Sequence, residues 1–367
     1  MRISAAAVVL SAIAVVPAMP ARAAEPTGRV ERTVGMMGTT LEIEVEAADR
    51  AAALAASEVA VRALEETEAR LSTWRADSEL ERLNRVPAGQ PVPLSPRLDA
   101  ELRAARRWWA ATDGAFDPAI GPLVVAWGLR TGGRVPTLAE RRAAVAAGSF
   151  GALRMEAGTA VRTRSDLRLE EGAWGKGAGL DAALAALRAD GRAAAAALNL
   201  GGQVAVYSRP GGPAAGAKRR WRLTLADPRV RSRAVVALAI DAGSVSTSGN
   251  SEHGFTLAGK RYGHLLDPRS GEPAPDFGSL TVWAADGLAA DALSTGLFVL
   301  GPQAALCWAG GHPEEQVIVL EATPAGLRAR ASAGLRGNLK AVAPGVEIDF
   351  AAADPRACSG EPKGGDR

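Results

Sequence analysis

The chain has 367 residues, among them 43 Lys or Arg, 40 Asp or Glu, 3 His and 2 Cys. Hydrophobic residues make up 47% and charged residues 23%, which provides enough apolar material for a sizeable globular core. Two cysteines exclude a disulfide scaffold and a Cys-rich zinc site, and three scattered histidines exclude a His-rich metal centre. Any metal should therefore be held by oxygen ligands.

Residues 1–23 predict a secretory signal peptide. Arg2 supplies the positive start, residues 3–19 are an uncharged apolar stretch, and Ala21-Arg22-Ala23 is a small-x-small cleavage site. The stretch contains a proline and is too short for a transmembrane anchor, which needs ~20 apolar residues. No Cys follows the cleavage site, so we expect no lipid anchor. We expect an exported, periplasmic protein without stable membrane insertion.

The basic pI of about 9.1 would suit a polyanion partner. Removal of the signal peptide takes away two arginines and no acid, so the net charge falls from +3 to +3 − 2 = +1. The remaining basic residues are interspersed with acids and form no block of like charge. We therefore expect no nucleic-acid partner.

The first half of the mature chain predicts one strand and three helices. Apolar and acidic residues alternate over 40–46, as in a half-buried strand. The first helix follows the cap Asp49, and its apolar stripe is Leu54, Val61, Leu64 and Leu71. The second follows the cap Ser95, with Pro96 in its first turn and a stripe at Leu98, Leu102, Ala105 and Trp109. The third begins just after Lys176 and stops at Gly191, and its stripe is Leu180, Leu184 and Leu187.

The second half predicts mainly strands. The β-rich runs between Gly and Pro clusters are 198–207, 221–226, 235–241 and 280–284. A hairpin is predicted for 255–257 and 262–266 around a turn at 258–260. A helix over 289–300 ends at Gly301-Pro302, and a short helix and a strand over 316–321 close the body. From about residue 352 the chain is polar with Gly and Pro, so 352–367 should be a disordered tail.

No internal repeat or long linker divides residues 24–351. They are expected to form one α/β (α+β) unit with a mixed or antiparallel sheet and flanking helices. Cys307 and Cys358 could pair in an oxidising compartment. Because Cys307 lies in a predicted helix and Cys358 in the polar tail, separate thiols are the preferred interpretation.

A glycine-rich segment over 172–179 leads into the third helix. Glycines and a helix N-terminus can cradle an anion with backbone amides. The spacing fits neither a Walker A loop, because Gly177 follows Lys176, nor a dinucleotide fingerprint. A tight strand-to-helix turn is an equally good interpretation of this segment.

Asp291 and Thr295 lie four residues apart in a helical run, so their oxygens share one face. With a backbone carbonyl, this pair could hold a hard cation. The competing interpretation places Asp291 in the first helical turn, where it complements the macrodipole, and lets Thr295 bond back to a carbonyl.

Two further segments carry polar chemistry. His264 precedes the turn signature Asp267-Pro268-x-x-Gly271 and could act as an acid or base, or be a structural strand histidine. Residues 245–250 read as a hydroxyl-rich loop that could donate hydrogen bonds to a ligand, or be only a loop.

Taken together and in order, these segments resemble the ApbE family of FAD:protein FMN transferases. The resemblance runs from about Val34 to Gly301. It rests on short segments that are weak singly and specific in combination: 36–39, 71–74, 78–80 with Asn84, 114–118, 121–123, 127–128, 172–177 with Asp181, 199–202, 247–250, 264–271 and 290–295.

The resemblance implies a two-lobed flavin-binding body and a specific activity. Such proteins are exported, bind FAD and Mg²⁺ and split the FAD pyrophosphate. They move FMN onto a Thr hydroxyl of an acceptor flavoprotein, typically a subunit of a membrane redox complex, and release AMP. Some relatives instead hydrolyse FAD to FMN and AMP.

Site residues follow from the resemblance by position. The Mg²⁺ ligands would be the Ala173 carbonyl, Asp291 and Thr295, with Asp291 also catalytic, and His264 would take the proton of the attacking Thr. Contacts to the flavin or adenine would come from Met37, Trp74, Ala115, Phe116, Asp117, Glu170 and Lys176. A hard metal and a backbone amide cradle would neutralise the pyrophosphate and its leaving group.

Four positions depart from the family pattern. Glu170-Glu171 stand where many relatives have Asp and an apolar residue, Ala178 replaces a common Tyr, and Gln203 replaces a frequent Asp. These changes leave the metal ligands intact and affect the flavin pocket. The alternatives are therefore an FAD pyrophosphatase, and a periplasmic flavin-binding protein with degenerate catalysis.

Overall fold

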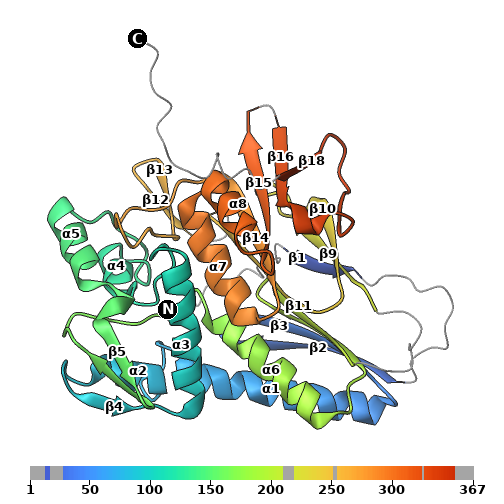
Figure 1. Ribbon diagram of the computed structural model, residues 1–367, viewed down its shortest axis with the longest axis horizontal. Helices are drawn as coiled ribbons and strands as arrows, with labels where there is room; N and C mark the ends of the chain where they lie inside the picture. Colours follow the sequence, from blue (N-terminus) through green and yellow to red (C-terminus); the bar gives the residue numbers. More distant parts are fainter. Residues whose placement is uncertain (1–12, 17–27, 210–218, 251–253, 325, 352–367) are drawn as a thin grey trace, which may run out of the picture.

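The computed structural model describes residues 13–16, 28–209, 219–250, 254–324 and 326–351 (Figure 1). The predicted tail 352–367 and most of the predicted signal peptide lie outside these residues. The described part of the predicted signal peptide, residues 13–16, forms β1 (Ile13–Val16), which pairs with β9 (Trp221–Ala226) in antiparallel register.

Among the described residues, nine strands form the central sheet. All neighbouring strands are antiparallel except the last two of the C-terminal edge, β16 and β18, which are parallel. Their spatial order is β18 (Ile348–Ala351), β16 (Gly326–Ser332), β15 (Gln316–Thr323), β14 (Gly278–Ala284), β11 (Gly243–Gly249), β8 (Gln203–Ser208), β7 (Ala195–Leu200), β3 (Thr39–Ala47) and β2 (Gly28–Met36). The predicted mixed sheet is confirmed.

Layers cover both faces of this sheet. One face carries α1 (Arg50–Leu71), α6 (Gly175–Asp190) and α7 (Gly287–Leu300), as Figure 1 shows. The other face packs on a second sheet, in which β9 pairs with β10 (Ala234–Ile240) and β10 with β17 (Leu339–Ala341). Strand β7 shows the alternation, because Ala196 and Leu198 face the helices while Ala195 and Ala197 face the second sheet.

A smaller lobe lies beside the sheets, at the left of Figure 1. It contains α2 (Glu79–Arg85), α3 (Pro96–Ala111), α4 (Gly121–Ala126), α5 (Leu138–Ala147), β4 (Pro91–Pro93), β5 (Leu153–Glu156), β6 (Thr159–Arg162) and the hairpin of β12 (Gly254–Leu257) and β13 (Lys260–Gly263). Helix α3 packs against α7, and one hydrophobic core runs through both lobes. The two lobes therefore form one folded unit.

The helix ends follow their local sequence signals. Asp49 accepts the Ala52 amide at 2.8 Å, and Ser95 accepts the Leu98 amide at 3.2 Å. Helix α6 stops at Gly191, whose φ of 73° is left-handed. These caps are confirmed, although α6 begins at Gly175, so that Lys176 lies in its first turn.

Two predicted apolar stripes are partly wrong. Leu54 is 47% exposed, because α1 buries an alanine-rich face against α6 and the sheet: Ala53, Ala56, Ala60, Leu64 and Leu71. Helix α3 buries Trp108, while Trp109 is only partly buried. In both helices the tertiary neighbours, rather than side-chain size, select the buried face.

The run predicted over 198–207 is two strands. Strands β7 and β8 form a hairpin around Gly201 and Gly202, which have φ values of 57° and 94°. Both strands are buried on both faces, so no alternation of polarity marks the turn.

Helix α8 (Pro302–Gly310) carries Cys307, which is disulfide-bonded. The preferred interpretation of separate thiols is therefore wrong for Cys307, and Cys358 lies outside the described residues. None of the helices in the described part of the chain has the length and apolar character of a membrane span.

Candidate active site

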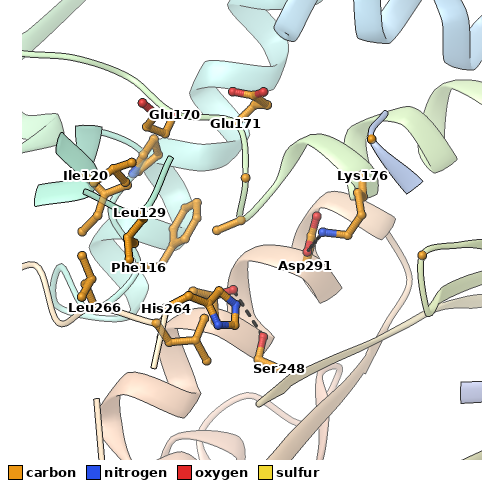
Figure 2. A pocket seen from close by; sticks show the side chains of 18 of the residues that line it. Phe116, Ile120, Leu129, Glu170, Glu171, Lys176, Ser248, His264, Leu266 and Asp291 are labelled. Atoms are coloured by element: carbon orange, nitrogen blue, oxygen red, sulfur yellow. Dashed lines mark hydrogen bonds and ion pairs between the residues drawn. The ribbon is translucent and has the colours of Figure 1, made fainter. Parts of the chain in front are cut away.

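A cavity of about 650 Å³ lies where the two lobes meet (Figure 2). Its walls come from the start of α6, the inner face of α7, strand β11, the segment 115–133 and the base of the β12–β13 hairpin. It gathers every residue predicted for the site: Met37, Trp74, Ala115, Phe116, Asp117, Glu170, Ala173, Lys176, His264, Asp291 and Thr295. The roles assigned to these residues remain predictions.

Helices α6 and α7 meet at the floor of the cavity in an arrangement we call the α6–α7 clasp, formed by Gly177, Asp181, Gly287 and Asp291. The Gly177 amide donates to Asp291 Oδ2 at 3.1 Å. The carboxylate of Asp181 accepts the amides of Gly287 and Leu288 at 2.6 and 2.9 Å, and so caps α7 from a neighbouring helix.

Gly177 is needed for close packing. A Cβ at this position would lie 2.1 Å from the Gly287 carbonyl oxygen, so only glycine lets α6 approach α7. A Cβ at Gly172 would meet nothing within 4 Å. The tight-turn interpretation therefore accounts for Gly177, which packs α6 against α7, while the anion cradle stays a prediction.

Asp291 lies in the second turn of α7 and is 3% exposed. Lys176 Nζ is 3.7 Å from Asp291 Oδ1. The carboxylate thus interacts with α6 and does not sit in the first turn of its own helix, as the macrodipole interpretation required. Lys176 is partly exposed and places a positive charge in the cavity wall.

The donor set suits a hard cation. Asp291, the Thr295 hydroxyl and the Ala173 carbonyl all belong to residues lining the same cavity. The described residues contain no group of three or more His, Cys, Asp or Glu side chains that could hold a metal. A metal here would depend on one carboxylate, neutral oxygens and the phosphates of its ligand, which is a common way to bind Mg²⁺.

Residues 243–249 are strand β11, so the predicted hydroxyl-rich loop at 245–250 is wrong except at its end. The strand pairs with β14 over 244–249 and with β8 over 243–245, and the hydroxyls of Ser246 and Ser248 lie 3.2 and 3.0 Å from Ser294 Oγ. Ser294 is fully buried and also donates to the Asp291 carbonyl. These hydroxyls attach α7 to β11 beneath Asp291 and Thr295.

His264 follows directly after β13 and is not part of the strand. Figure 2 shows its ring on the cavity wall. The turn after it is confirmed, since the Gly271 amide donates to the Asp267 carbonyl at 2.7 Å. Asn250, which is buried, anchors the segment by donating to the Ala274 carbonyl at 3.1 Å.

The side chain of Asp117 is occupied by its own chain. Its carboxylate accepts the Ala119 and Phe150 amides and the Trp109 Nε1 proton at 2.7 to 3.1 Å. Burial raises the pKa of Asp117 to about 6, against the effect of these three donors. The side chain of Asp117 therefore supports the cavity wall. Any contact of Asp117 with the ligand would involve a carboxylate that is already hydrogen-bonded to the protein.

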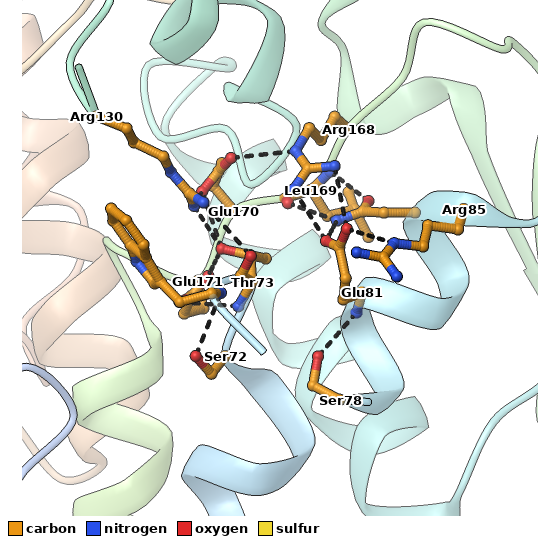
Figure 3. Close-up of polar contacts among 12 residues, drawn as sticks. Ser72, Thr73, Ser78, Glu81, Arg85, Arg130, Arg168, Leu169, Glu170 and Glu171 are labelled. Atoms are coloured by element: carbon orange, nitrogen blue, oxygen red, sulfur yellow. Dashed lines mark hydrogen bonds and ion pairs between the residues drawn. The ribbon is translucent and has the colours of Figure 1, made fainter. Parts of the chain in front are cut away.

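A cluster of charged residues forms another part of the cavity wall (Figure 3). Arg130 bonds to Glu170 and to Thr73 Oγ1, and Glu171 accepts from the Thr73 amide and hydroxyl at 3.1 and 2.6 Å. Burial raises the pKa of Glu170, although the Arg130 charge acts in the opposite direction. The unusual Glu170-Glu171 pair is thus balanced by partners that sequence reasoning missed.

Arg130 also lies over Trp74, with its Cζ 4.3 Å from the ring centroid. Trp74 is 72% exposed, so its other face is available to a planar ligand. The only sequence signal for this partnership was the flat side chain itself, because Arg130 is distant along the chain.

Gln203 is buried between β8 and α7. Its Nε2 donates to the Gly287 carbonyl at 2.8 Å and to Ser244 Oγ at 3.3 Å, while its Oε1 has no partner among the described residues. The amide joins the α6–α7 clasp to the sheet, where a carboxylate could not donate these bonds.

Comparison with known proteins gives a consistent result. The ApbE family model matches residues 37–319. An FAD:protein FMN transferase of Rhodobacter capsulatus is 35% identical over 286 residues, which is 76% of this chain and 53% of that protein. One from Vibrio cholerae is 30% identical over 283 residues, 75% of this chain and 82% of that protein. The chain thus spans about half the length of the first relative and most of the second.

Solved structures share the fold. Flavin transferase ApbE from Vibrio cholerae superposes with a TM-score of 0.72 at 27% identity, covering 85% of this chain and 100% of that one. The apo form of the Pseudomonas stutzeri flavinyl transferase ApbE also gives 0.72, at 26% identity, covering 84% and 96%. The predicted fold class is confirmed.

Proposed function

The chain belongs to the ApbE family, and from this membership we propose that it is an FAD:protein FMN transferase. It would attach FMN to a Thr of an acceptor protein and release AMP. The observation that carries the proposal is the cavity that brings together an oxygen donor set, a lysine, a histidine and an exposed aromatic face. These are the groups that pyrophosphate transfer from a flavin dinucleotide needs.

The residues divide the work of the reaction. Lys176 offsets the pyrophosphate charge, and Trp74 offers a face for a ring. Asp291, Thr295 and the Ala173 carbonyl would hold Mg²⁺, which supplies charge neutralisation at the phosphates when bound. Ser294 and the α6–α7 clasp keep the metal-binding carboxylate in place.

The chemical step breaks the phosphoanhydride bond of FAD and forms a phosphoester to the acceptor. The Thr oxygen of the acceptor forms a bond to the phosphorus of the FMN half. The bond from that phosphorus to the bridging oxygen breaks, and that oxygen leaves with AMP. The hydroxyl proton passes to a ring nitrogen of His264, which lies on the cavity wall.

The setting of the reaction is also part of the proposal. The signal peptide predicted over 1–23 would export the chain to the periplasm. There it would modify an acceptor flavoprotein subunit of a membrane redox complex.

The test is mass spectrometry of a candidate acceptor co-expressed with this chain. We expect a mass gain of one FMN phosphoester, which Asp291→Ala removes and the exposed control Asp349→Ala retains. Unchanged labelling by Asp291→Ala would contradict the metal assignment. Rapid release of FMN and AMP from FAD and Mg²⁺ without acceptor would favour the pyrophosphatase, and FAD binding without turnover the degenerate flavin-binding protein.

A further inference from the structure

The β12–β13 hairpin stands at the mouth of the cavity as a two-stranded sheet of its own. Its base lines the cavity through Gly254 and Phe255, and His264 follows its second strand. The register runs from Gly254 opposite Gly263 at the base to Leu257 opposite Lys260 at the tip. Three residues of strand carry the tip about 10 Å away from the base.

One face of the hairpin is firmly packed. The Phe255 and Tyr262 rings stack with centroids 5.2 Å apart, and Tyr262 lies 5.8 Å from Trp127. Gly133 makes room for Phe255, since a Cβ there would lie 2.2 Å from the ring. This packing makes the hairpin a rigid support, which an isolated pair of strands would not be.

The rest of the hairpin faces solvent and is basic. Leu257, Lys260 and Arg261 are exposed, and the described residues of both strands include no acid. Lys260 and Arg261 form no ion pair with any described residue: Lys260 lies near the Tyr262 ring, and Arg261 donates to the Asn250 carbonyl. Neither strand pairs with a further described strand, so backbone groups at both edges are open.

Four exposed apolar side chains belong to the segments that line the cavity, each within two residues of a lining residue. We call them the rim: Trp74, Val125, Val135 and Leu257. Large exposed apolar side chains on segments that border a cavity are typical of an interaction surface.

We propose that the β12–β13 hairpin and the rim are the docking surface for the acceptor, and that the acceptor presents an extended acidic segment there. The inference rests on the proposed function, because it places the partner of that reaction. An extended segment can pair with an open strand edge, and its acids complement Lys260 and Arg261. The hairpin base then leads the acceptor hydroxyl to His264 in the cavity.

The test uses two fluorescent twelve-residue peptides with one central Thr, flanked by Asp and Ala in one and by Lys and Ala in the other. We expect the acidic peptide to bind the FAD-loaded protein at least about tenfold more tightly than the basic one, with an affinity that falls as salt rises. The double variant Lys260→Glu with Arg261→Glu should reverse this preference.

A matched control makes the same charge change on exposed residues of α1 and β17, Arg62→Glu with Lys340→Glu. It should leave peptide binding unchanged, and both double variants should keep the affinity for FAD. Equal weakening in the two double variants, or no preference for the acidic peptide, would overturn the docking surface.

Peptide binding and FMN transfer are read separately. If the acidic peptide binds through the hairpin but no FMN is transferred to it or to a co-expressed acceptor, the proposed function fails and the docking surface stands. If transfer occurs and the hairpin variant transfers as efficiently as wild type, the docking surface fails and the proposed function stands.

Discussion

The α6–α7 clasp and the hairpin with its rim border the same cavity but are built in opposite ways. Asp291 is 3% exposed and held by a backbone amide of α6 and a hydroxyl of α7, whereas Trp74 is 72% exposed. Phosphate chemistry needs groups fixed to within a fraction of an ångström, and packed helices provide that. A partner protein needs an accessible surface. The division predicts that changes in the clasp affect stability and rate, while changes at the rim affect binding.

The largest effect is expected from Gly177→Ala. The new methyl would overlap the Gly287 carbonyl and force α6 away from α7. We expect the free energy of unfolding to fall by about 1–3 kcal/mol and the transfer rate by about 100-fold, because the site is misplaced. Urea unfolding and initial rates measure the two quantities. Gly172→Ala is the control for stability and should unfold like wild type; a Gly177→Ala protein of wild-type stability would refute the packing role.

Asp117 predicts a dependence of stability on pH. Burial raises its pKa to about 6, so the folded protein holds this proton more tightly than the unfolded chain. Its contribution is fully present below about pH 4 and is lost as the pH rises through about 6, with a span of about 3 kcal/mol. The unfolding free energy of the wild type should therefore fall relative to that of Asp117→Asn as the pH rises from 4 to 7. A constant difference for Asp117→Asn would contradict the raised pKa.

The smallest effect on stability is expected from Trp74→Ala. The ring is exposed and touches mainly Arg130, so the unfolding free energy should change by less than about 0.5 kcal/mol. The KM for FAD should rise about fivefold if the free face stacks on a ring of the ligand. Leu54→Ala, also an exposed apolar truncation, should leave the KM unchanged. A large loss of stability in Trp74→Ala would erase the contrast between rim and clasp.

Short-range signals determined much of this protein from the sequence alone. The caps Asp49, Ser95 and Gly191 depend on neighbours within four residues, and they lie where they were predicted. The strand predicted over 221–226 has those bounds in β9, because alternation of polarity is also local. The ordered motifs were sufficient to identify the family and to choose residues that share one cavity.

The tertiary structure decided what these residues contact. Gly177 meets Asp291 across 114 positions, and Arg130 meets Glu170 across 40. It also decided that Leu54 faces solvent and that 198–207 divides into two strands. Such contacts depend on which faces the helices and sheets bury against one another. No pattern within a few residues encodes that choice, because the partner that completes it lies elsewhere in the chain.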